Sequence, residues 1–231
     1  MSTAPLWCVV PAAGRGARVG GDRPKQYLPI AGRALIEHTL ERLATHPRIA
    51  GLMVILAPDD GFWPGFEQLH GTPVRVATGG AERSDSVLAG LEALPAEVHA
   101  DDFVLVHDAA RPCVRAADIT RLIAHAGAGD GGLLGAPLRD TLKRADRQHH
   151  SIATEPRELR WRAFTPQMFR RGPLAAALRA CSAEGIAVSD EAMAMESAGH
   201  APLLVEGAED NLKVTTAADY ALAEFLLART S

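Results

Sequence analysis

The chain has 231 residues, with 24 Lys and Arg against 28 Asp and Glu, so its formal net charge is −4. Without a basic excess, and with only 5% aromatic residues, it lacks the charge and the stacking platforms of proteins that bind long nucleic acids. The length and the 47% hydrophobic fraction suit a single domain over residues 1–231 with its own core.

Cysteine usage and the chain's beginning point to a soluble cytoplasmic protein. The three cysteines lack metal-ligand spacing and are odd in number, which argues against structural zinc and against a disulfide framework. Residues 1–6 lack the pattern of a signal peptide, and no stretch approaches the ~20 apolar residues of a membrane span. We therefore expect neither a membrane nor a nucleic acid as a partner.

Strands and helices are predicted to alternate through the first part of the chain. The predicted strands are Trp7–Val10, Leu52–Ala57, Val74–Ala77, Phe103–Val106 and Gly132–Ala136. The predicted helices are Ala34–His46, Ser84–Leu94 and Ala116–Ala126. Alternation of this kind favours an α/β fold: a Rossmann-like, mostly parallel sheet flanked by helices, with ligands at the carboxyl ends of the strands.

A polar segment at about residues 138–160 interrupts this pattern. A solvated loop and a projecting β-arm are equal alternatives for it. Beyond it the pattern predicts helices over Met168–Cys181, Glu191–Ser197 and Ala217–Ala228, and a strand over Leu203–Val205. Thr216 and Asp219 have the spacing of a capping box for the last helix.

The loop after the first predicted strand has the composition of a phosphate site. It reads Pro11-Ala12-Ala13-Gly14-Arg15-Gly16-Ala17-Arg18, and Arg23-Pro24-Lys25-Gln26 follows. Glycines let several N–H groups point at one anion, and four cations within eleven residues suit a triphosphate. The Walker pattern is absent, and Val19 breaks the dinucleotide pattern. The alternative is a mobile loop with solvated arginines.

Two further strings lie where an open α/β sheet holds its ligand. In Val104–Pro112 a buried strand runs into Asp108, with Arg111 close behind. A charge at that point could face a ligand, although Asp108 and Arg111 could simply pair or Asp108 could begin a turn. In Gly79–Val87 glycines precede a helix start, where free N–H groups could meet a ligand or Ser84 or Asp85 could cap the helix.

These strings together resemble one family. P-A-A-G-x-G-x-R with P-K-Q, then H-D-A-A-R-P, R-D-T-x-K and T-P-Q are similar to the 2-C-methyl-D-erythritol 4-phosphate cytidylyltransferases of the non-mevalonate isoprenoid pathway. The resemblance runs from about Val10 to the final helix. It implies transfer of CMP from CTP to 2-C-methyl-D-erythritol 4-phosphate, which gives 4-diphosphocytidyl-2-C-methyl-D-erythritol and pyrophosphate, with Mg²⁺ as the expected metal.

The resemblance also implies a role for each matching residue. The implied catalytic residues are Arg18 and Lys25, on the charge that develops at the α-phosphorus, and Arg157 and Lys213, which align the attacking phosphate. The implied CTP-binding residues are Pro11, Ala12, Ala13, Gly14, Gly16, Gly80, Ala81, Ser86 and Ala109. The implied acceptor-binding residues are Asp108, Arg111, Thr141, Thr165 and Ser189, and the implied metal ligands are Asp108 and Asp210. Two positions depart from the family's pattern, since Ala81 is commonly acidic in relatives and Ser189 replaces a threonine.

In the family the arm exchanges between two subunits, which implies a homodimer in which Thr141 and Arg157 complete the partner's acceptor site. The nearest rival function is the same chemistry on another polyol phosphate, such as ribitol 5-phosphate. A catalytically inactive nucleotide-binding module is the rival from another class, and the presence of Arg18, Lys25 and Lys213 argues against it. A dinucleotide-dependent dehydrogenase is a weaker rival.

Overall fold

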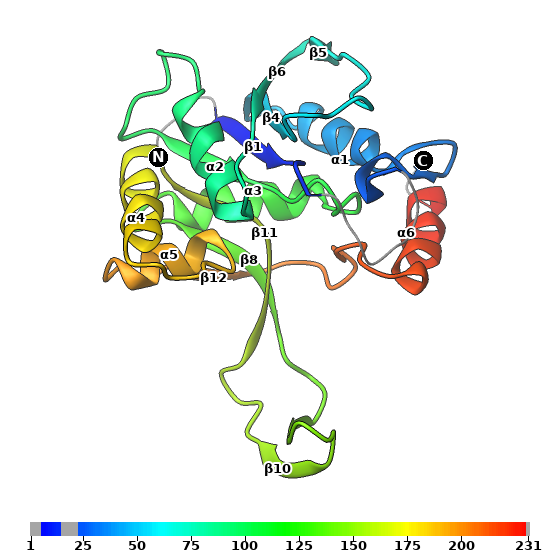
Figure 1. The fold of residues 1–231 in the computed structure, drawn as a ribbon, viewed down its shortest axis with the longest axis vertical. Helices are drawn as coiled ribbons and strands as arrows, with labels where there is room; N and C mark the ends of the chain where they lie inside the picture. Colours follow the sequence, from blue (N-terminus) through cyan, green and yellow to red (C-terminus); the bar gives the residue numbers. More distant parts are fainter. Residues whose placement is uncertain (1–5, 15–22, 230–231) are drawn as a thin grey trace.

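The computed structural model of the chain describes residues 6–14 and 23–229. Its centre is an eight-stranded sheet in the order β12-β8-β11-β7-β1-β4-β6-β5 (Figure 1). The strands are β1 (Leu6–Pro11), β4 (Ile49–Leu56), β5 (Gln68–Leu69), β6 (Thr72–Thr78), β7 (Phe103–Val106), β8 (Gly132–Pro137), β11 (Trp161–Arg170) and β12 (Leu203–Glu206).

Parallel pairing dominates the part of the sheet that the sequence pattern predicted. β1 pairs in parallel with β4 and β7, β4 with β6, and β8 with β12. All four residues of β7 are buried, as are six of the eight in β4, which fits continuous apolar runs covered on both faces. The predicted mostly parallel α/β sheet is confirmed.

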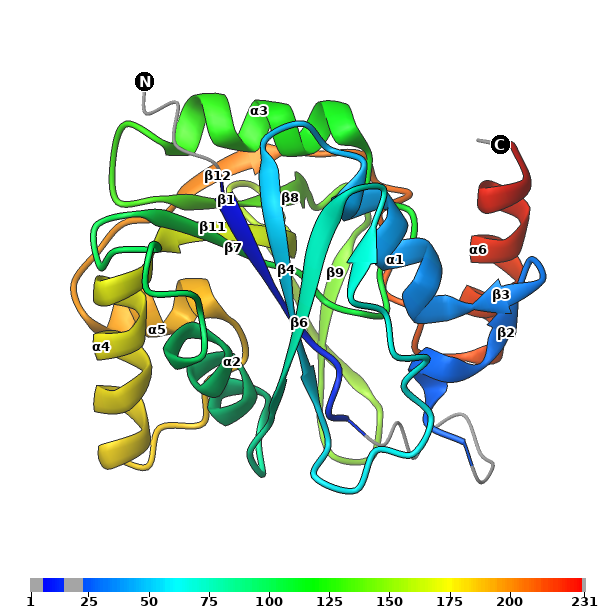
Figure 2. The same cartoon turned by 90° about the horizontal axis from the view of Figure 1, so that it is seen from above.

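Helices cover both faces of the sheet (Figure 2). On one face, α1 (Leu35–Ala44) and α3 (Ala116–Ala126) pack into a core with the strands through side chains such as Leu40 and Ile119. On the other face, α2 (Arg83–Glu92), α4 (Arg171–Ala183) and α5 (Glu191–Ser197) form a second core. The last helix, α6 (Ala217–Arg229), packs against Ile30 and Leu35 in a smaller cluster.

The start of α6 has the predicted capping box. The backbone N–H of Asp219 donates to the Thr216 hydroxyl (3.2 Å), and the backbone N–H of Thr216 donates to the Asp219 carboxylate (2.8 Å). Among helices within the described ranges, none has the length and apolar character needed to cross a membrane.

The predicted helix over Met168–Cys181 is wrong at its start. Strand β11 continues to Arg170, and α4 begins only at Arg171. Residues 164–169 are all buried, and β11 runs antiparallel between β7 and β8, bonded to both. The pairing on two sides overrides the local helical pattern, because the backbone groups of a buried segment must find partners.

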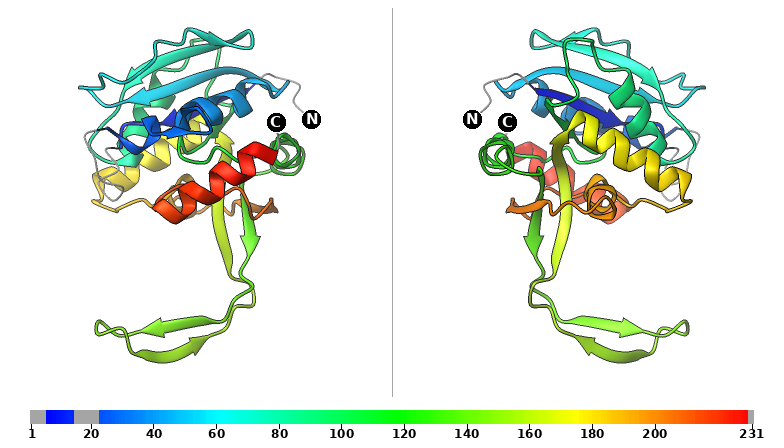
Figure 3. Two further views of the ribbon diagram at one scale, coloured as in Figure 1. Left: turned by 90° about the vertical axis from the view of Figure 1, so that its right-hand side faces the viewer. Right: turned by 90° about the vertical axis from the view of Figure 1, so that its left-hand side faces the viewer.

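The polar segment between β8 and β11 forms a projecting two-stranded ribbon (Figures 1 and 3). Its strands are β9 (Leu142–Ala145) and β10 (Ser151–Glu155), paired antiparallel with Leu142 opposite Glu155. Three large apolar side chains on this arm are exposed: Leu142, Ile152 and Leu159. Of the two alternatives for this segment, the structure therefore shows the projecting β-arm and not the solvated loop.

Candidate active site

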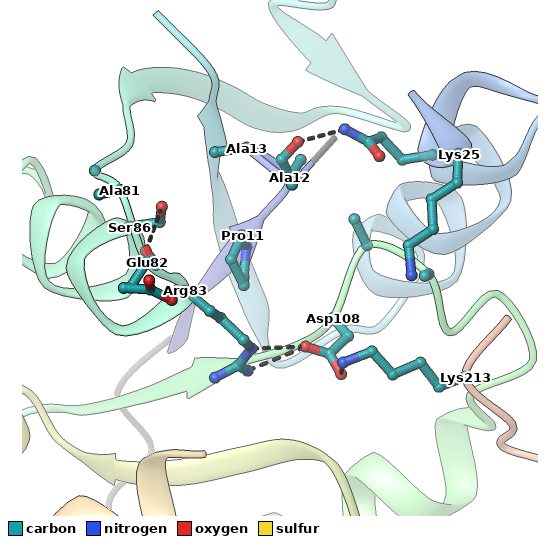
Figure 4. Close-up of a pocket in the computed structure, with 15 residues that line it drawn as sticks. Pro11, Ala12, Ala13, Lys25, Ala81, Glu82, Arg83, Ser86, Asp108 and Lys213 are labelled. Carbon is teal, nitrogen blue, oxygen red and sulfur yellow. Dashed lines mark hydrogen bonds and ion pairs between the residues drawn. The ribbon is translucent and has the colours of Figure 1, made fainter. Parts of the chain in front are cut away.

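A cleft opens where the carboxyl ends of β1 and β7 meet the beginning of α2 (Figure 4). Most of the predicted nucleotide-binding residues line it: Pro11, Ala12, Ala13, Gly14, Gly80, Ala81, Ser86 and Ala109. The predicted residues Lys25, Asp108 and Lys213 line it as well. Segments far apart in the sequence therefore meet at one edge of the sheet, as the parallel topology predicts.

One wall of the cleft is the turn that leads into α2. A Cβ atom at Gly79 would lie 2.6 Å from Ser86 Oγ and 2.9 Å from Ala13 Cβ, so only glycine fits between them. Asp85 caps the helix, since its carboxylate accepts the backbone N–H of Glu82 (3.1 Å). The buried Ser86 hydroxyl donates to the Glu82 carbonyl (3.1 Å), which leaves oxygen lone pairs for a ligand.

The opposite wall carries Lys25, which begins the short 3₁₀ helix η1 (Lys25–Tyr27). Its Nζ donates to the backbone carbonyl of Val214 (3.2 Å). The buried Gln26 side chain donates from Nε2 to the Ala12 carbonyl, and so joins η1 to the end of β1. These two hydrogen bonds hold the lysine in place beside the first part of the glycine loop.

Asp108 lies at the floor of the cleft and is only 6% exposed. One carboxylate oxygen, Oδ1, accepts from Arg83 (3.0 Å), and the other, Oδ2, pairs with Lys213 Nζ (3.0 Å) and Arg111 Nε (3.4 Å). Burial alone would raise the pKa of this carboxyl group, but the three cations hold the pKa of Asp108 well below its usual range. The carboxylate is therefore ionised at neutral pH and fixes these cations around it.

A buried network lies behind Asp108. His107 donates from Nε2 to the Arg111 carbonyl (3.1 Å), and its Nδ1 accepts the Thr165 hydroxyl (3.0 Å). The same hydroxyl oxygen accepts the backbone N–H of Asp108 (3.1 Å). Burial lowers the pKa of His107 to about 4, and this neutral tautomer satisfies every partner in the network. Thr165, predicted to bind the acceptor, uses its hydroxyl here and is 3% exposed.

Arg83 is a residue of the cleft to which the sequence analysis gave no role. Its guanidinium reaches Asp108 on one side and the buried Glu191 on the other, with Nη1 at 2.6 Å and Nη2 at 3.2 Å from the Glu191 oxygens. Burial opposes its charge, but Glu191 and Asp108 together raise the pKa of Arg83. Its position three residues after Gly80 and at the start of a helix was the available signal.

Three predicted residues that the structure describes, Thr141, Arg157 and Ser189, do not line this cleft. Thr141 and Arg157 line a hollow on the projecting arm, where Arg157 donates to the Arg139 carbonyl. Ser189 is exposed, and its hydroxyl contacts the Met193 sulfur (3.5 Å). Gly16 and Arg18 lie outside the described residues.

Asp210 lies in a different hollow from Asp108. It forms an ion pair with Arg115 and lines a pocket with Arg42 and Cys113. The two carboxylates predicted to share a metal are therefore not brought together. Nor do the described residues contain a group of three His, Cys, Asp or Glu side chains that could hold a metal ion.

The cleft can bind a polyanion. Lys25 and Lys213 bring fixed positive charge to one edge, and the glycine turns bring backbone groups close to any ligand. Its one buried carboxylate is already paired with cations. The fold and this cleft define the class of the protein: a nucleotide-binding α/β protein equipped for transfer of a phosphorylated group, in which fixed cations stabilise charge on phosphate oxygens.

Comparison with known proteins gives the particular family. The family model described as 2-C-methyl-D-erythritol 4-phosphate cytidylyltransferase matches residues 6–229. The chain belongs to this family.

Its relatives agree over nearly the whole length. The chain is 58% identical over 227 residues to the 2-C-methyl-D-erythritol 4-phosphate cytidylyltransferase of Xanthomonas euvesicatoria, covering 97% of this chain and 86% of that one. It is 56% identical over 229 residues to the protein of the same name from Stenotrophomonas maltophilia, covering 98% of each. A crystal structure of 4-diphosphocytidyl-2C-methyl-D-erythritol synthase superimposes with a TM-score of 0.84 at 35% identity, covering 97% of this chain and 99% of that one.

Proposed function

We propose that this chain transfers CMP from CTP to 2-C-methyl-D-erythritol 4-phosphate, giving 4-diphosphocytidyl-2-C-methyl-D-erythritol and pyrophosphate. The observation that carries the proposal is the cleft, in which Lys25, Lys213 and the glycine turns converge at the carboxyl ends of β1 and β7. The family and the names of the relatives supply the substrates. Both substrates are small soluble phosphates, and we place the reaction in the cytoplasm.

The chemistry needs positioning more than proton transfer. A phosphate monoester is already an anionic nucleophile at neutral pH, so one of its oxygens can attack the α-phosphorus without a general base. The new P–O bond forms as the bond to the β-phosphate oxygen breaks, and pyrophosphate leaves with the electron pair. Two polyanions must approach each other, and the fixed cations offset that repulsion.

The lysines divide this work between the two substrates. Lys25 lines the cleft together with Gly14 of the glycine loop, where it would face the triphosphate. Lys213 forms an ion pair with Asp108, with 3.0 Å between Nζ and Oδ2. We assign this part of the cleft to the phosphate of the acceptor substrate. Each is held by an acceptor from the protein, and neither has to be ordered when substrate arrives.

Selection of cytosine follows from Ser86. Because its hydroxyl proton is used by the Glu82 carbonyl (3.1 Å), the oxygen is left as an acceptor. Cytosine carries an amino group where uracil carries a carbonyl oxygen, so an acceptor at this place favours CTP over UTP. Ala81 lines the same wall, and its backbone groups serve the base without the acidic side chain that is common at this position.

The geometry does not fit a resident magnesium ion on Asp108 and Asp210. Asp108 is surrounded by three cations, and Asp210 is paired with Arg115 elsewhere. Mg²⁺ takes phosphate oxygens and water readily. We therefore propose that Mg²⁺ arrives bound to the phosphates of CTP, as part of the substrate, and no step above depends on a protein-held metal.

The arm supports a shared active site. Thr141 and Arg157 lie on the arm that projects from the body of their own chain (Figure 3), and neither lines that chain's cleft. Large apolar side chains are exposed on the same arm. We propose a homodimer in which the arm of each chain supplies Thr141 and Arg157 to the other chain's acceptor site. Mixing Lys213→Ala chains with Arg157→Ala chains should then restore activity, because the mixed dimer keeps one intact site. Chains that carry both substitutions should restore nothing.

The decisive experiment measures pyrophosphate release with CTP and Mg²⁺. We expect turnover with 2-C-methyl-D-erythritol 4-phosphate and little with ribitol 5-phosphate. A clear preference for ribitol 5-phosphate would replace the acceptor and leave the nucleotide chemistry intact. CTP binding without turnover of either acceptor would indicate an inactive nucleotide-binding module, and binding of NAD without CTP would indicate a dehydrogenase.

A further inference from the structure

Glu191 is a buried charge that the mechanism above does not use. It is the first residue of α5, and it is 0% exposed. Its two carboxylate oxygens accept from the two terminal nitrogens of Arg83, at 2.6 and 3.2 Å. Burying such a pair is costly, and a pair of this kind is weak support for stability compared with apolar side chains of the same volume. Its partner Arg83 lines the cleft, so the charge of Glu191 bears on the site.

The pair fixes the orientation of one guanidinium. A guanidinium is planar with its donors in a rigid fork, so two bonds to Glu191 also fix the direction of Nε. That nitrogen lies 3.0 Å from Asp108 Oδ1. The other oxygen of Asp108 then faces Lys213 Nζ at 3.0 Å. A continuous chain of charged contacts therefore runs from Glu191 through Arg83 and Asp108 to Lys213.

The other half of the cleft is held by different contacts. Lys25 is bonded to the Val214 carbonyl, and Gln26 to the Ala12 carbonyl. None of these contacts involves Glu191 or Arg83. A disturbance at Glu191 should consequently reach the acceptor half of the cleft and leave the triphosphate half in place.

We propose that Glu191 is a positioning residue for the acceptor phosphate, which acts through the orientation of Arg83 and so through Asp108 and Lys213. Glu191 also neutralises Arg83, so that this guanidinium is not a free competitor for the phosphate groups in the cleft. This inference rests on the proposed function, in which Lys213 aligns the phosphate of the acceptor substrate.

Glu191→Gln tests the proposal, because it keeps the shape of the side chain and removes its charge. We expect kcat/KM for 2-C-methyl-D-erythritol 4-phosphate to fall roughly 10²-fold, since displacement of a positioning group by about 1 Å costs that much. The KM for CTP should stay unchanged. The matched control is Glu92→Gln at the other end of α2, which removes one carboxylate from an exposed pair with Arg179 (2.7 Å). That control should keep both kinetic constants.

A second comparison separates positioning from stability. In an Arg83→Met background, Glu191→Gln should have no further effect on kcat/KM for the acceptor, because the connection is already broken. Arg83→Lys keeps the charge but loses the fork, and should by itself reproduce the selective loss toward the acceptor. This variant keeps the proposal testable even where Glu191→Gln folds poorly.

The outcomes are distinguishable. An active wild-type enzyme with a Glu191→Gln variant of equal kcat/KM would overturn the inference, as would a Glu191→Gln effect that persists in the Arg83→Met background. An Arg83→Lys variant that binds and uses the acceptor normally would also overturn it. Failure of the wild-type enzyme to use either substrate would instead remove the proposed function.

Discussion

His107 should make the protein sensitive to mild acid. The imidazole is completely buried, and burial lowers its pKa from 6.5 to about 4. Between these pH values the unfolded chain binds a proton at this position and the folded chain does not. Stability therefore falls as the pH drops below about 6.5, and the loss is complete only near pH 4.

The size of the loss follows from the two pKa values. One group with pKa 6.5 when unfolded and about 4 when folded contributes about 2 kcal/mol less to the free energy of unfolding at pH 5 than at pH 7. The hydrogen bond between His107 and Thr165 connects the imidazole to the network behind Asp108, so protonation of His107 would also disturb that network. His107→Gln keeps one donor for the Arg111 carbonyl and one acceptor for the Thr165 hydroxyl, but it cannot take up a proton.

The assay is urea unfolding of both proteins at pH 7 and pH 5. The wild-type protein should lose about 2 kcal/mol more than His107→Gln over this interval. Burial also lowers the pKa of His46, but that residue is present in both proteins and cancels in the comparison. An equal pH dependence in the two proteins would refute the reasoning, and would mean that His107 is protonated within the fold at pH 5.

Three other substitutions probe the cleft. Lys213→Met should lower kcat/KM for the acceptor by about 10²–10³, as loss of one fixed charge-stabilising group does, and steady-state kinetics with varied acceptor would check it. Ser86→Ala should reduce the preference for CTP over UTP by about tenfold, because it removes one acceptor, and competition between the two nucleotides would measure it. Tyr27→Phe should lower the free energy of unfolding by about 1 kcal/mol, because the Tyr27 hydroxyl donates to the Asp60 carboxylate (2.8 Å) at the end of η1. The same variant should raise the KM for CTP, because Tyr27 and Lys25 lie on the same short helix η1. An unchanged KM would mean that the contact with Asp60 does not help to position Lys25.

The strands and helices that a local pattern specifies were predictable. Phe103–Val106, Ala116–Ala126 and Glu191–Ser197 begin and end where the sequence indicated. β11 was not predictable, because its state is decided by partners on two sides that are distant in sequence. The residues of the arm lack a hydrophobic face of their own, and periodicity therefore left a loop and a ribbon open as alternatives.

In the candidate site, too, local motifs were predictable from the sequence and contacts between distant residues were not. Short motifs found the glycine loop, the Gly79–Val87 turn and Asp108, because each lies directly after a strand or before a helix. The contact between Arg83 and Glu191 spans 108 positions, and the contact between Asp108 and Thr165 spans 57. Nothing local in the sequence records such pairings, so the role of Arg83 and the buried use of the Thr165 hydroxyl emerged only from the fold.

The arrangement of charge also explains how a chain of net charge −4 can bind two polyanions. A lysine side chain has about 2 kcal/mol of rotamer entropy to lose when a ligand orders it. Here Asp108 and the Val214 carbonyl already hold Lys213 and Lys25 at the cleft. Asp108 and Glu191 carry two negative charges beside the three cations Arg83, Arg111 and Lys213, so the net charge around Asp108 stays positive. The Asp108 carboxylate therefore weakens the attraction of the cleft for phosphate, but it holds the cations in place before the substrates arrive. Cations that are already in place can stabilise charge in the transition state without reorganisation.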